Sequence, residues 1–287
     1  MIKSTDDSIV QTIDGVSFKL SAPFDFEFLK EYGRVFKVFD DQDSGNICFG
    51  LAKGDERYFL KFAGAPTARS TCPAEQAIES LRSSVPLYRA LRHDNLIELL
   101  DAGEAGAGYA ALFRWADGIC MGRMYEEDHA KFMAIPIRKR VKIYADVLKF
   151  LIHVNAQGYF AVDFYDGSVM YDEKTGKTTI CDIDFFRRKP CVNDMGRMWG
   201  SSKFMSPEEF QRGAVLDEVT NVYTAGAMAF ALFGGYSKEE NSWTLPAGLY
   251  VTAAKATSDD RSLRQQSLLE LWEEWESAIK ANRLGEC

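Results

Sequence analysis

Three charged residues of this sequence have the types and the order that chemistry on a phosphate group requires. Lys61 ends the apolar segment Tyr58-Phe-Leu-Lys61, and Asp163 and Asp184 each follow an apolar segment further along the chain. Phosphoryl transfer needs a cation on the phosphates, a carboxylate that holds a metal ion and a carboxylate close to the incoming hydroxyl group. Each residue taken singly is most often a solvated surface residue, so the argument depends on the segments around them.

Two segments of the second half surround the two aspartates: Phe160-Ala-Val-Asp163-Phe-Tyr-Asp-Gly-Ser168 and Asp182-Ile-Asp184-Phe-Phe186. The first resembles the catalytic loop and the second the Asp-Phe-Gly turn of the eukaryotic-like protein kinase superfamily. Ser168 stands where the family has a metal-binding asparagine, and Phe186 stands in place of the glycine. The resemblance implies that Asp163 serves the acceptor hydroxyl and that Asp184 holds Mg²⁺ or Mn²⁺. Ser168 would be a weaker, neutral second ligand, for which Asp166 could compensate.

Further motifs follow in the order that the superfamily has them. Met205-Ser-Pro-Glu208 resembles the Ala-Pro-Glu motif, and Arg264 stands where the family has the arginine that pairs with this glutamate. Asn221-Val-Tyr-Thr-Ala-Gly226 resembles the start of the central helix, with asparagine in place of aspartate. The resemblance covers roughly residues 33–281 and implies a structural ion pair between Glu208 and Arg264.

The residue that would pair with Lys61 stays open. The resemblance implies that Lys61 binds the phosphates of ATP and that a glutamate of the following helix pairs with it. Glu79 lies at about the right distance, and Glu75 lies one turn earlier. Counting back from His93-Asp-Asn-Leu96, which resembles the turn after that helix, places Ser84 in the glutamate position instead.

The segments expected to hold the nucleotide depart most from the family pattern. Gly45 is the one glycine left in the loop between the first two strands, where three aspartates would repel phosphate unless a cation intervenes. A solvated acidic hairpin is an equal alternative for this loop. Phe113 would lie at the back of the nucleotide pocket, with the backbone from Arg114 to Ala116 facing adenine; a core aromatic role also fits Phe113. The three aspartates are Asp40, Asp41 and Asp43.

A basic run, Arg187-Arg-Lys189, follows the turn of Asp184. Contact with an acidic substrate or a nucleotide phosphate is one interpretation, and a solvated basic face is the more common one. Val162 precedes Asp163 where many regulated kinases have arginine, so a switch based on phosphorylation is not expected.

The local patterns predict a β-rich part followed by a mainly helical part. We expect strands over Arg34–Phe39, Asn46–Leu51, Arg57–Phe62, Leu96–Leu100 and Tyr109–Trp115, with a helix over Ala74–Leu91 that Pro86 kinks or ends. We expect later helices over Arg138–Asn155, Val219–Phe233 and Ser267–Ala281, and a hairpin turn at Glu173–Gly176. The fold class is therefore α+β. The resemblance assigns residues 1–116 to a β-rich lobe and 117–287 to a helical lobe of one kinase-like domain.

Composition and charge indicate which partners and which cellular location to expect. Of the 287 residues 46% are hydrophobic and 26% are charged, which is typical of a globular protein, and the net charge of −8 argues against nucleic acid as a partner. The six cysteines form no Cys-x-x-Cys pair, which argues against a zinc site or a disulfide framework. Met1 to Asp7 lacks the pattern of a signal peptide and no apolar run reaches 18 residues, so we expect a cytoplasmic protein without a membrane partner.

These observations favour an ATP-dependent phosphotransferase, and the resemblance implies a Ser/Thr protein kinase whose protein substrate is unknown. One alternative is a pseudokinase that keeps the fold to present a binding surface. Another is a kinase for a small hydroxylated metabolite. The acidic loop, Ser168 and Phe186 motivate the pseudokinase alternative.

Overall fold

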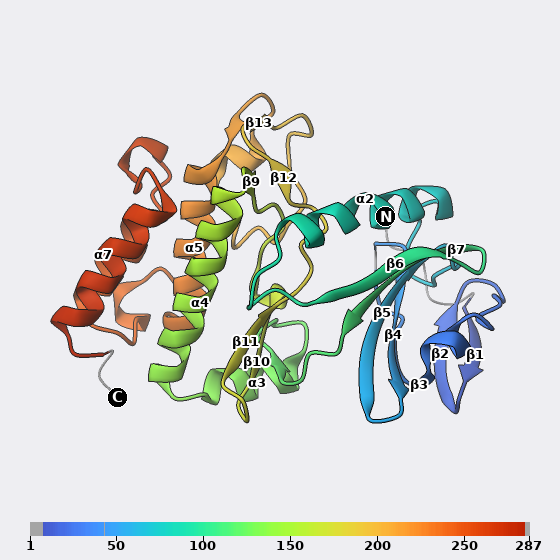
Figure 1. Ribbon diagram of the computed structural model, residues 1–287. Coiled ribbons are helices and arrows are strands. Elements are labelled where there is room, and N and C mark those ends of the chain that lie inside the picture. The colour runs from blue at the N-terminus through green and yellow to red at the C-terminus, as the bar shows by residue number, and fades with distance from the viewer. Residues whose placement is uncertain (1–7, 43, 285–287) are drawn as a thin grey trace. The chain divides into compact units, whose positions relative to one another are not determined.

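The computed structural model describes residues 8–42 and 44–284, and its chain separates into two compact units (Figure 1). Unit 1 consists of Met1–Arg92 and Ile97–Ala116, and unit 2 consists of His93–Leu96 and Asp117–Cys287. Unit 1 is rich in β-sheet and unit 2 is mainly helical, so the prediction of an α+β chain of this order is confirmed. The expectations for Met1–Asp7, Asp43 and Cys287 fall outside the described residues.

Unit 1 is built on one antiparallel sheet of five strands in the order β3-β4-β5-β7-β6. Each strand pairs with its neighbours through a continuous ladder, apart from one irregularity in β3 and one in β6. The predicted strands are present, and the structure lengthens the second and third and moves the fourth towards the C-terminus. The bounds are β3 Arg34–Phe39, β4 Asn46–Lys53, β5 Glu56–Ala63, β6 Leu99–Ala105 and β7 Gly108–Arg114.

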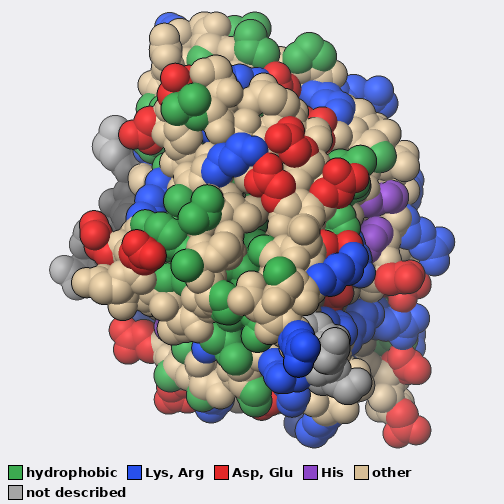
Figure 2. Space-filling model, turned by 90° about the vertical axis from the view of Figure 1, so that its left-hand side faces the viewer, with side chains coloured by type: hydrophobic (Ala, Val, Ile, Leu, Met, Phe, Trp, Pro, Cys, Tyr) green, Lys and Arg blue, Asp and Glu red, His purple; other side chains and the backbone are tan. Residues whose placement is uncertain are grey.

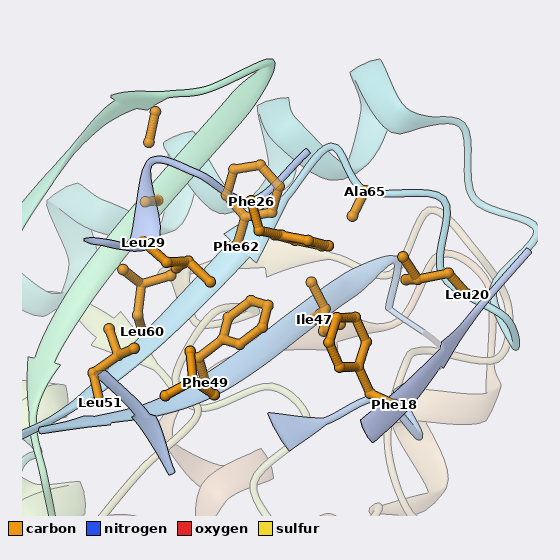
Figure 3. Close-up of a cluster of buried hydrophobic side chains, with 13 residues drawn as sticks. Phe18, Leu20, Phe26, Leu29, Ile47, Phe49, Leu51, Leu60, Phe62 and Ala65 are labelled. Carbon is orange, nitrogen blue, oxygen red and sulfur yellow. The ribbon is translucent and has the colours of Figure 1, made fainter. Parts of the chain in front are cut away.

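One face of this sheet is buried under an aromatic cluster that the sequence patterns did not reveal. Leu60 and Phe62 of β5 point to the same side as Phe49 of β4, and they pack with Phe18 and Phe26 from the segment before the sheet (Figure 3). The rings of Phe26 and Phe49 have centroids 5.3 Å apart, in a T-shaped arrangement. A hairpin and one short helical turn carry this cover: β1 Ile9–Ile13, β2 Val16–Leu20 and α1 Leu29–Tyr32.

The opposite face of the sheet packs against α2, Ala74–Ala90. Tyr88 of α2 meets Phe113 of β7 with ring centroids 4.8 Å apart, and Phe113 in turn meets Phe59 of β5 at 6.3 Å. Side chains alternate along a strand, so Lys61 lies on the same face as Phe59, opposite Leu60 and Phe62. The helix continues through Pro86 to its end at Ala90.

Unit 2 is organised around α5, Glu218–Phe233, of which every residue after the first is buried. The helix begins at a capping box in which the Asp217 side chain accepts a hydrogen bond from the Val219 N–H. Tyr144 of α4 donates a hydrogen bond to the Ala225 carbonyl at 3.1 Å, and its ring packs at a tilt against Trp275 of α7 with centroids 4.5 Å apart. The other helices of unit 2 are α3 Glu126–Ala134, α4 Ile137–Ala156, α6 Ala247–Ala256 and α7 Leu268–Ala281.

Short strands connect these helices. The predicted hairpin is present as β10 and β11, and β10 also pairs with β8. Two further two-stranded pairs, β9 with β12 and β13 with β14, frame the segment that follows Asp184. The bounds are β8 Ile119–Cys120, β9 Tyr159–Phe160, β10 Val169–Asp172, β11 Lys177–Ile180, β12 Arg187–Arg188, β13 Cys191–Val192 and β14 Val215–Leu216.

The surface carries charges of both signs. Figure 2 shows one face, on which acidic and basic side chains are interspersed with apolar ones. Among the described residues, no helix is long and apolar enough to cross a membrane.

Candidate functional site

The loop that carries Asp163 is held in place by α5. The Asn221 side chain accepts a hydrogen bond from the Ala161 N–H at 2.6 Å and donates one to the Ala161 carbonyl at 2.7 Å. Both residues are buried, so the side-chain amide of Asn221 takes the place of water for the N–H and the carbonyl of Ala161. The asparagine that replaces the family's aspartate can do this because it is both donor and acceptor.

Replacing Asn221 with alanine should therefore cost about 2–3 kcal/mol of folding stability, because it leaves two buried backbone groups of Ala161 without partners. Urea unfolding followed by circular dichroism measures this loss. Asn241→Ala in an exposed turn is the matched control and should change stability by less than about 0.5 kcal/mol. An equal, small effect in both variants would contradict the role given to Asn221.

Asp163 itself adopts a backbone conformation that is rare for its type. Its φ is +57°, in the left-handed region, where a non-glycine residue carries strain of about 1–3 kcal/mol. It lines a shallow recess of unit 2 together with Ser201, Phe204, Glu209 and five other residues. A strained carboxylate that faces a recess is typical of a functional position. The other five residues are Ala161, Phe164, Gly200, Met205 and Thr224.

Asp166 has structural partners at both carboxylate oxygens. One oxygen accepts hydrogen bonds from the Tyr236 hydroxyl at 2.6 Å and from the Arg123 N–H at 3.2 Å, and the other accepts from the Gly167 N–H at 3.0 Å. The side chain is buried. These contacts favour a role in positioning the loop over the idea that Asp166 compensates for a weak metal ligand.

Ser168, the predicted second metal ligand, lies in the interior of unit 2. Its side chain is completely buried, and its Oγ has no hydrogen-bond partner among the described residues. Its carbonyl accepts from the Cys181 N–H at 2.9 Å, three residues before Asp184. A buried hydroxyl without a partner costs about 1–3 kcal/mol, which a bound ion would offset.

The described residues contain no metal cage made of protein side chains alone. No group of three or more His, Cys, Asp or Glu side chains that could hold a metal occurs within residues 8–42 and 44–284. Magnesium is commonly bound by one or two carboxylates, with the phosphates of the substrate and water completing the shell. Asp184 and Ser168 as ligands of such a site stay a prediction.

The turn around Asp184 also contains a left-handed residue. Asp182 has a φ of +58°, and Phe186, the residue that replaces the glycine, is buried with its ring 6.3 Å from those of Phe150 and Phe164. Phe186 therefore packs as part of the core of unit 2.

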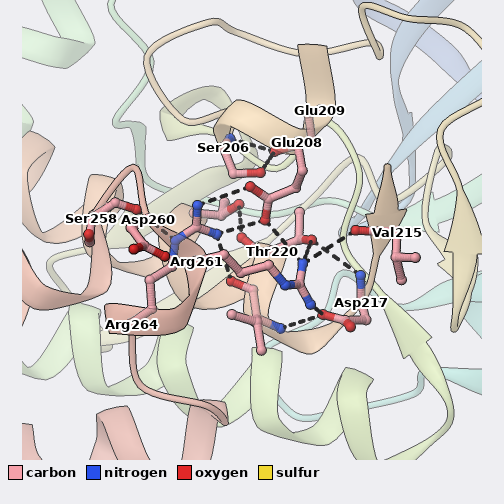
Figure 4. A network of polar contacts seen from close by, with 12 residues as sticks. Ser206, Glu208, Glu209, Val215, Asp217, Thr220, Ser258, Asp260, Arg261 and Arg264 are labelled. Carbon is pink, nitrogen blue, oxygen red and sulfur yellow. Dashed lines mark hydrogen bonds and ion pairs between the residues drawn. The ribbon is translucent and has the colours of Figure 1, made fainter. Parts of the chain in front are cut away.

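The predicted pair of Glu208 and Arg264 is confirmed. Two guanidinium nitrogens of Arg264 donate to the two carboxylate oxygens of Glu208 at 2.7 and 2.9 Å (Figure 4). Arg261 adds a third contact to Glu208 at 3.3 Å and an ion pair to Asp217 at the start of α5. Burial opposes ionisation of Glu208, but the hydrogen bonds from Arg264, a backbone hydrogen bond and the charges of Arg264 and Arg261 together outweigh it and hold the pKa of Glu208 below its usual range.

The pKa of the neighbouring Glu209 is shifted in the opposite direction. Burial raises the pKa of the Glu209 carboxyl to about 7, although hydrogen bonds from the Ser206 N–H and hydroxyl lower it. Two adjacent carboxyls thus differ in charge near neutral pH because only Glu208 has a guanidinium partner at contact distance.

The raised pKa of Glu209 predicts a specific dependence of stability on pH. The unfolded chain releases this proton near pH 4.5 and the folded chain near pH 7, so stability falls as pH rises between these values. Glu209→Gln removes this contribution. The free energy of unfolding of the variant, relative to the unsubstituted chain, should rise by about 2–4 kcal/mol from pH 4.5 to pH 7.5. Urea unfolding of both proteins at several pH values measures this difference. A difference that stays the same from pH 4.5 to pH 7.5 would contradict the prediction.

Lys61 lies within β5, where it pairs with Cys48 of β4 and Ala111 of β7. Glu79 lies on α2 with a largely exposed side chain, and its carboxylate contacts Arg82 at 2.8 Å. Ser84 is buried and donates to the Leu81 carbonyl within the helix. The assignment of a partner to Lys61 therefore stays a prediction.

The acidic loop between β3 and β4 is tied to the rest of unit 1. Asp40 accepts a hydrogen bond from the Lys19 N–H at 2.6 Å, and Asp41 forms an ion pair with Arg69. Gly45 has a φ of +83°, and a Cβ there would lie 3.0 Å from the Cβ of Ala77. Its close packing against α2 accounts for the glycine without a phosphate, so its predicted contact with a nucleotide stays a prediction.

The backbone proposed to face adenine is partly used within the sheet. The Arg114 N–H donates to the Glu98 carbonyl, and the Trp115 N–H donates to the Arg57 carbonyl. Two of the three N–H groups are thus not available to adenine, and the contact with adenine stays a prediction. Phe113 is buried as a core aromatic.

The basic run after Asp184 is engaged within unit 2. Arg187 contacts Asp194 at 3.5 Å, Arg188 lies over the Tyr159 ring, and Lys189 bonds to the Asn155 side chain. These contacts favour a structural role for the run.

The comparison with known proteins found a relative of part of this chain. It is a serine/threonine-protein kinase. The relative is PksC of Streptomyces coelicolor, 28% identical over 170 residues, which cover 56% of this chain and 30% of PksC. The chain thus spans about a third of the length of this relative. No family model matches the chain. The likeness supports a kinase-like relationship at a coarse level and leaves the roles of individual residues open.

No motif or pattern in the sequence predicted the roles of two residues of this region. Tyr236 comes from the loop after α5 and reaches Asp166 only through the fold, and its φ of +67° is unusual for a bulky residue. Glu209 resembles any exposed glutamate beside a proline turn, and its burial appears only in the structure.

Proposed function

We propose that the chain is an ATP-dependent phosphotransferase that moves the γ-phosphate to a serine or threonine hydroxyl of a protein. Units 1 and 2 are, in this proposal, the two lobes of one protein-kinase-like domain that acts in the cytoplasm. The observation that carries the proposal is the conformation of Asp163. Its backbone lies in the left-handed region, the residue lines a recess, and Asn221 hydrogen-bonds to the loop that carries it.

Each residue has a separate task in this proposal. Lys61 supplies a cation for the phosphates, with Glu79 as its proposed partner. Asp163 accepts the proton of the acceptor hydroxyl as it attacks. Asp184 and Ser168 would hold Mg²⁺ or Mn²⁺, and the ion, when bound, neutralises charge on the phosphate oxygens.

The test is transfer of label from γ-labelled ATP, in the presence of magnesium, to a serine-rich acceptor protein such as dephosphorylated casein. Labelled phosphoserine or phosphothreonine is the expected product. Label released only as free phosphate, or transferred only to a small metabolite, would overturn the protein-kinase assignment.

A second candidate is a binding module without catalysis, and one feature of unit 1 favours it. The face of the sheet that carries Lys61 is crowded with rings: Phe36 lies 5.0 Å from Trp115, and Phe39 lies 5.7 Å from Phe59, centroid to centroid. Phe59 stands two residues before Lys61 on the same face. Failure to bind nucleotide with any metal would make this candidate the preferred one.

A further inference from the structure

Two cations share one aromatic ring beside the recess of Asp163. The Arg123 guanidinium carbon lies 4.9 Å from the centroid of the Tyr236 ring, and the Lys203 Nζ lies 5.2 Å from it. The hydroxyl of the same ring donates to Asp166. Tyr236 is thus fixed at its tip while its ring holds two positive charges.

Neither cation has a carboxylate partner in the part of the chain that the structure describes. Arg123 and Lys203 are both exposed, and two positive charges held at the same ring repel each other. A cation on an aromatic ring gains about 0.5–1 kcal/mol at an exposed site, which holds the two side chains near each other. Such a pair attracts an anion from solution.

The pair lies next to the proposed acceptor position. Phe204, the residue after Lys203, lines the recess with Asp163 and meets the Tyr236 ring with centroids 6.3 Å apart. Asp166, which holds the Tyr236 hydroxyl, belongs to the same loop as Asp163. Two independent contacts therefore tie the cation pair to the recess.

The surrounding segment has the opposite charge from the chain as a whole. Residues 187–216 contain six basic and three acidic residues, a net charge of +3, whereas the whole chain has −8. Two of those acids are withdrawn from the surface, since Glu208 pairs with Arg264 and Glu209 is buried. An acidic ligand is thus complementary to this segment and repelled by much of the rest.

We infer that Arg123 and Lys203 form a recognition site for an acidic side chain of the acceptor protein, close to the hydroxyl that receives phosphate. This inference deepens the proposed function and rests on it for the identity of the ligand as a substrate. It predicts that the preferred serine or threonine is flanked by aspartate or glutamate.

Binding and transfer are measured separately so that the two hypotheses can fail independently. Fluorescence anisotropy follows a labelled peptide with one serine flanked by glutamates, and a matched peptide in which lysines replace the glutamates. The same peptides then serve as acceptors with magnesium and ATP. The glutamate peptide should bind roughly 5- to 10-fold more tightly than the lysine peptide at low salt, with a smaller difference at high salt.

The variant Arg123→Glu/Lys203→Glu should abolish or reverse this preference. Lys174→Glu/Lys177→Glu, at two exposed positions of the β10–β11 hairpin, changes the net charge equally and should retain it. The milder Arg123→Gln/Lys203→Gln keeps the test valid if the reversal variant is unstable, and it should lose most of the preference.

Equal binding of both peptides, or the same loss of preference in both charge-reversal variants, would overturn the site. An oligonucleotide that binds more tightly than the glutamate peptide, through the same two residues, would overturn the assignment to an acidic peptide. Selective peptide binding without phosphate transfer would support the site and overturn the proposed kinase function.

Discussion

Replacing Asp163 with asparagine should lower the rate of phosphate transfer by about 10²–10⁴-fold, the usual contribution of a positioned general base. Asparagine has nearly the same shape and retains an acceptor oxygen, but it cannot take a proton from the attacking hydroxyl at neutral pH. Nucleotide binding should change little because Asp163 is assigned to the acceptor. Initial rates with γ-labelled ATP and casein, together with a binding titration, measure both quantities.

The matched control is Asp194→Asn, which makes the same chemical change at an exposed aspartate of unit 2. Its transfer rate should stay within about twofold of that of the unsubstituted chain. Equal rates for Asp163→Asn and Asp194→Asn would show that Asp163 is not the base. Loss of nucleotide binding in Asp163→Asn would place it at the nucleotide and not at the acceptor.

Replacing Arg264 with methionine should destabilise the chain by about 3–5 kcal/mol, because it leaves the carboxylate of Glu208 buried without its main partner. The Arg264 side chain is completely buried and makes a two-point contact, so water cannot replace it at low cost. The midpoint and slope of urea unfolding give the loss.

Two further variants separate the ion pair from simple packing. Arg261→Met removes a partly exposed contact with Glu208 together with the ion pair to Asp217, and it should cost only about 1–2 kcal/mol. The double variant Glu208→Gln/Arg264→Met removes both charges and should be more stable than Arg264→Met alone. A double variant that is less stable than the single one would contradict an uncompensated charge as the cause.

Much of the fold was predictable because its elements have strong local patterns. The strand Arg34–Phe39 is found with the predicted bounds, and the helix predicted over Arg138–Asn155 is one residue longer at each end. The hairpin β1–β2 was missed because its strands have five residues each and gain their stability from the aromatic cluster that they cover. Such burial has no signature within a short segment.

The candidate site was predictable where a motif fixes spacing, and it was not where the fold brings distant residues together. The pair of Glu208 and Arg264, 56 residues apart, followed from the resemblance. The contact of Tyr236 with Asp166, 70 residues apart, belongs to no motif. The partner of Lys61 stayed open for a similar reason. An insertion of one turn keeps the same helix face towards the sheet but changes which residue of that face lies opposite Lys61.

The central claim, that this chain uses a nucleotide with a metal ion, is tested most directly by calorimetric titration of ATP with and without magnesium or manganese. The account predicts binding that requires the metal and is lost in Asp184→Ala and in Lys61→Ala, with Asp194→Ala as a control that still binds. No binding with either metal, or binding that both substitutions leave intact, would contradict it.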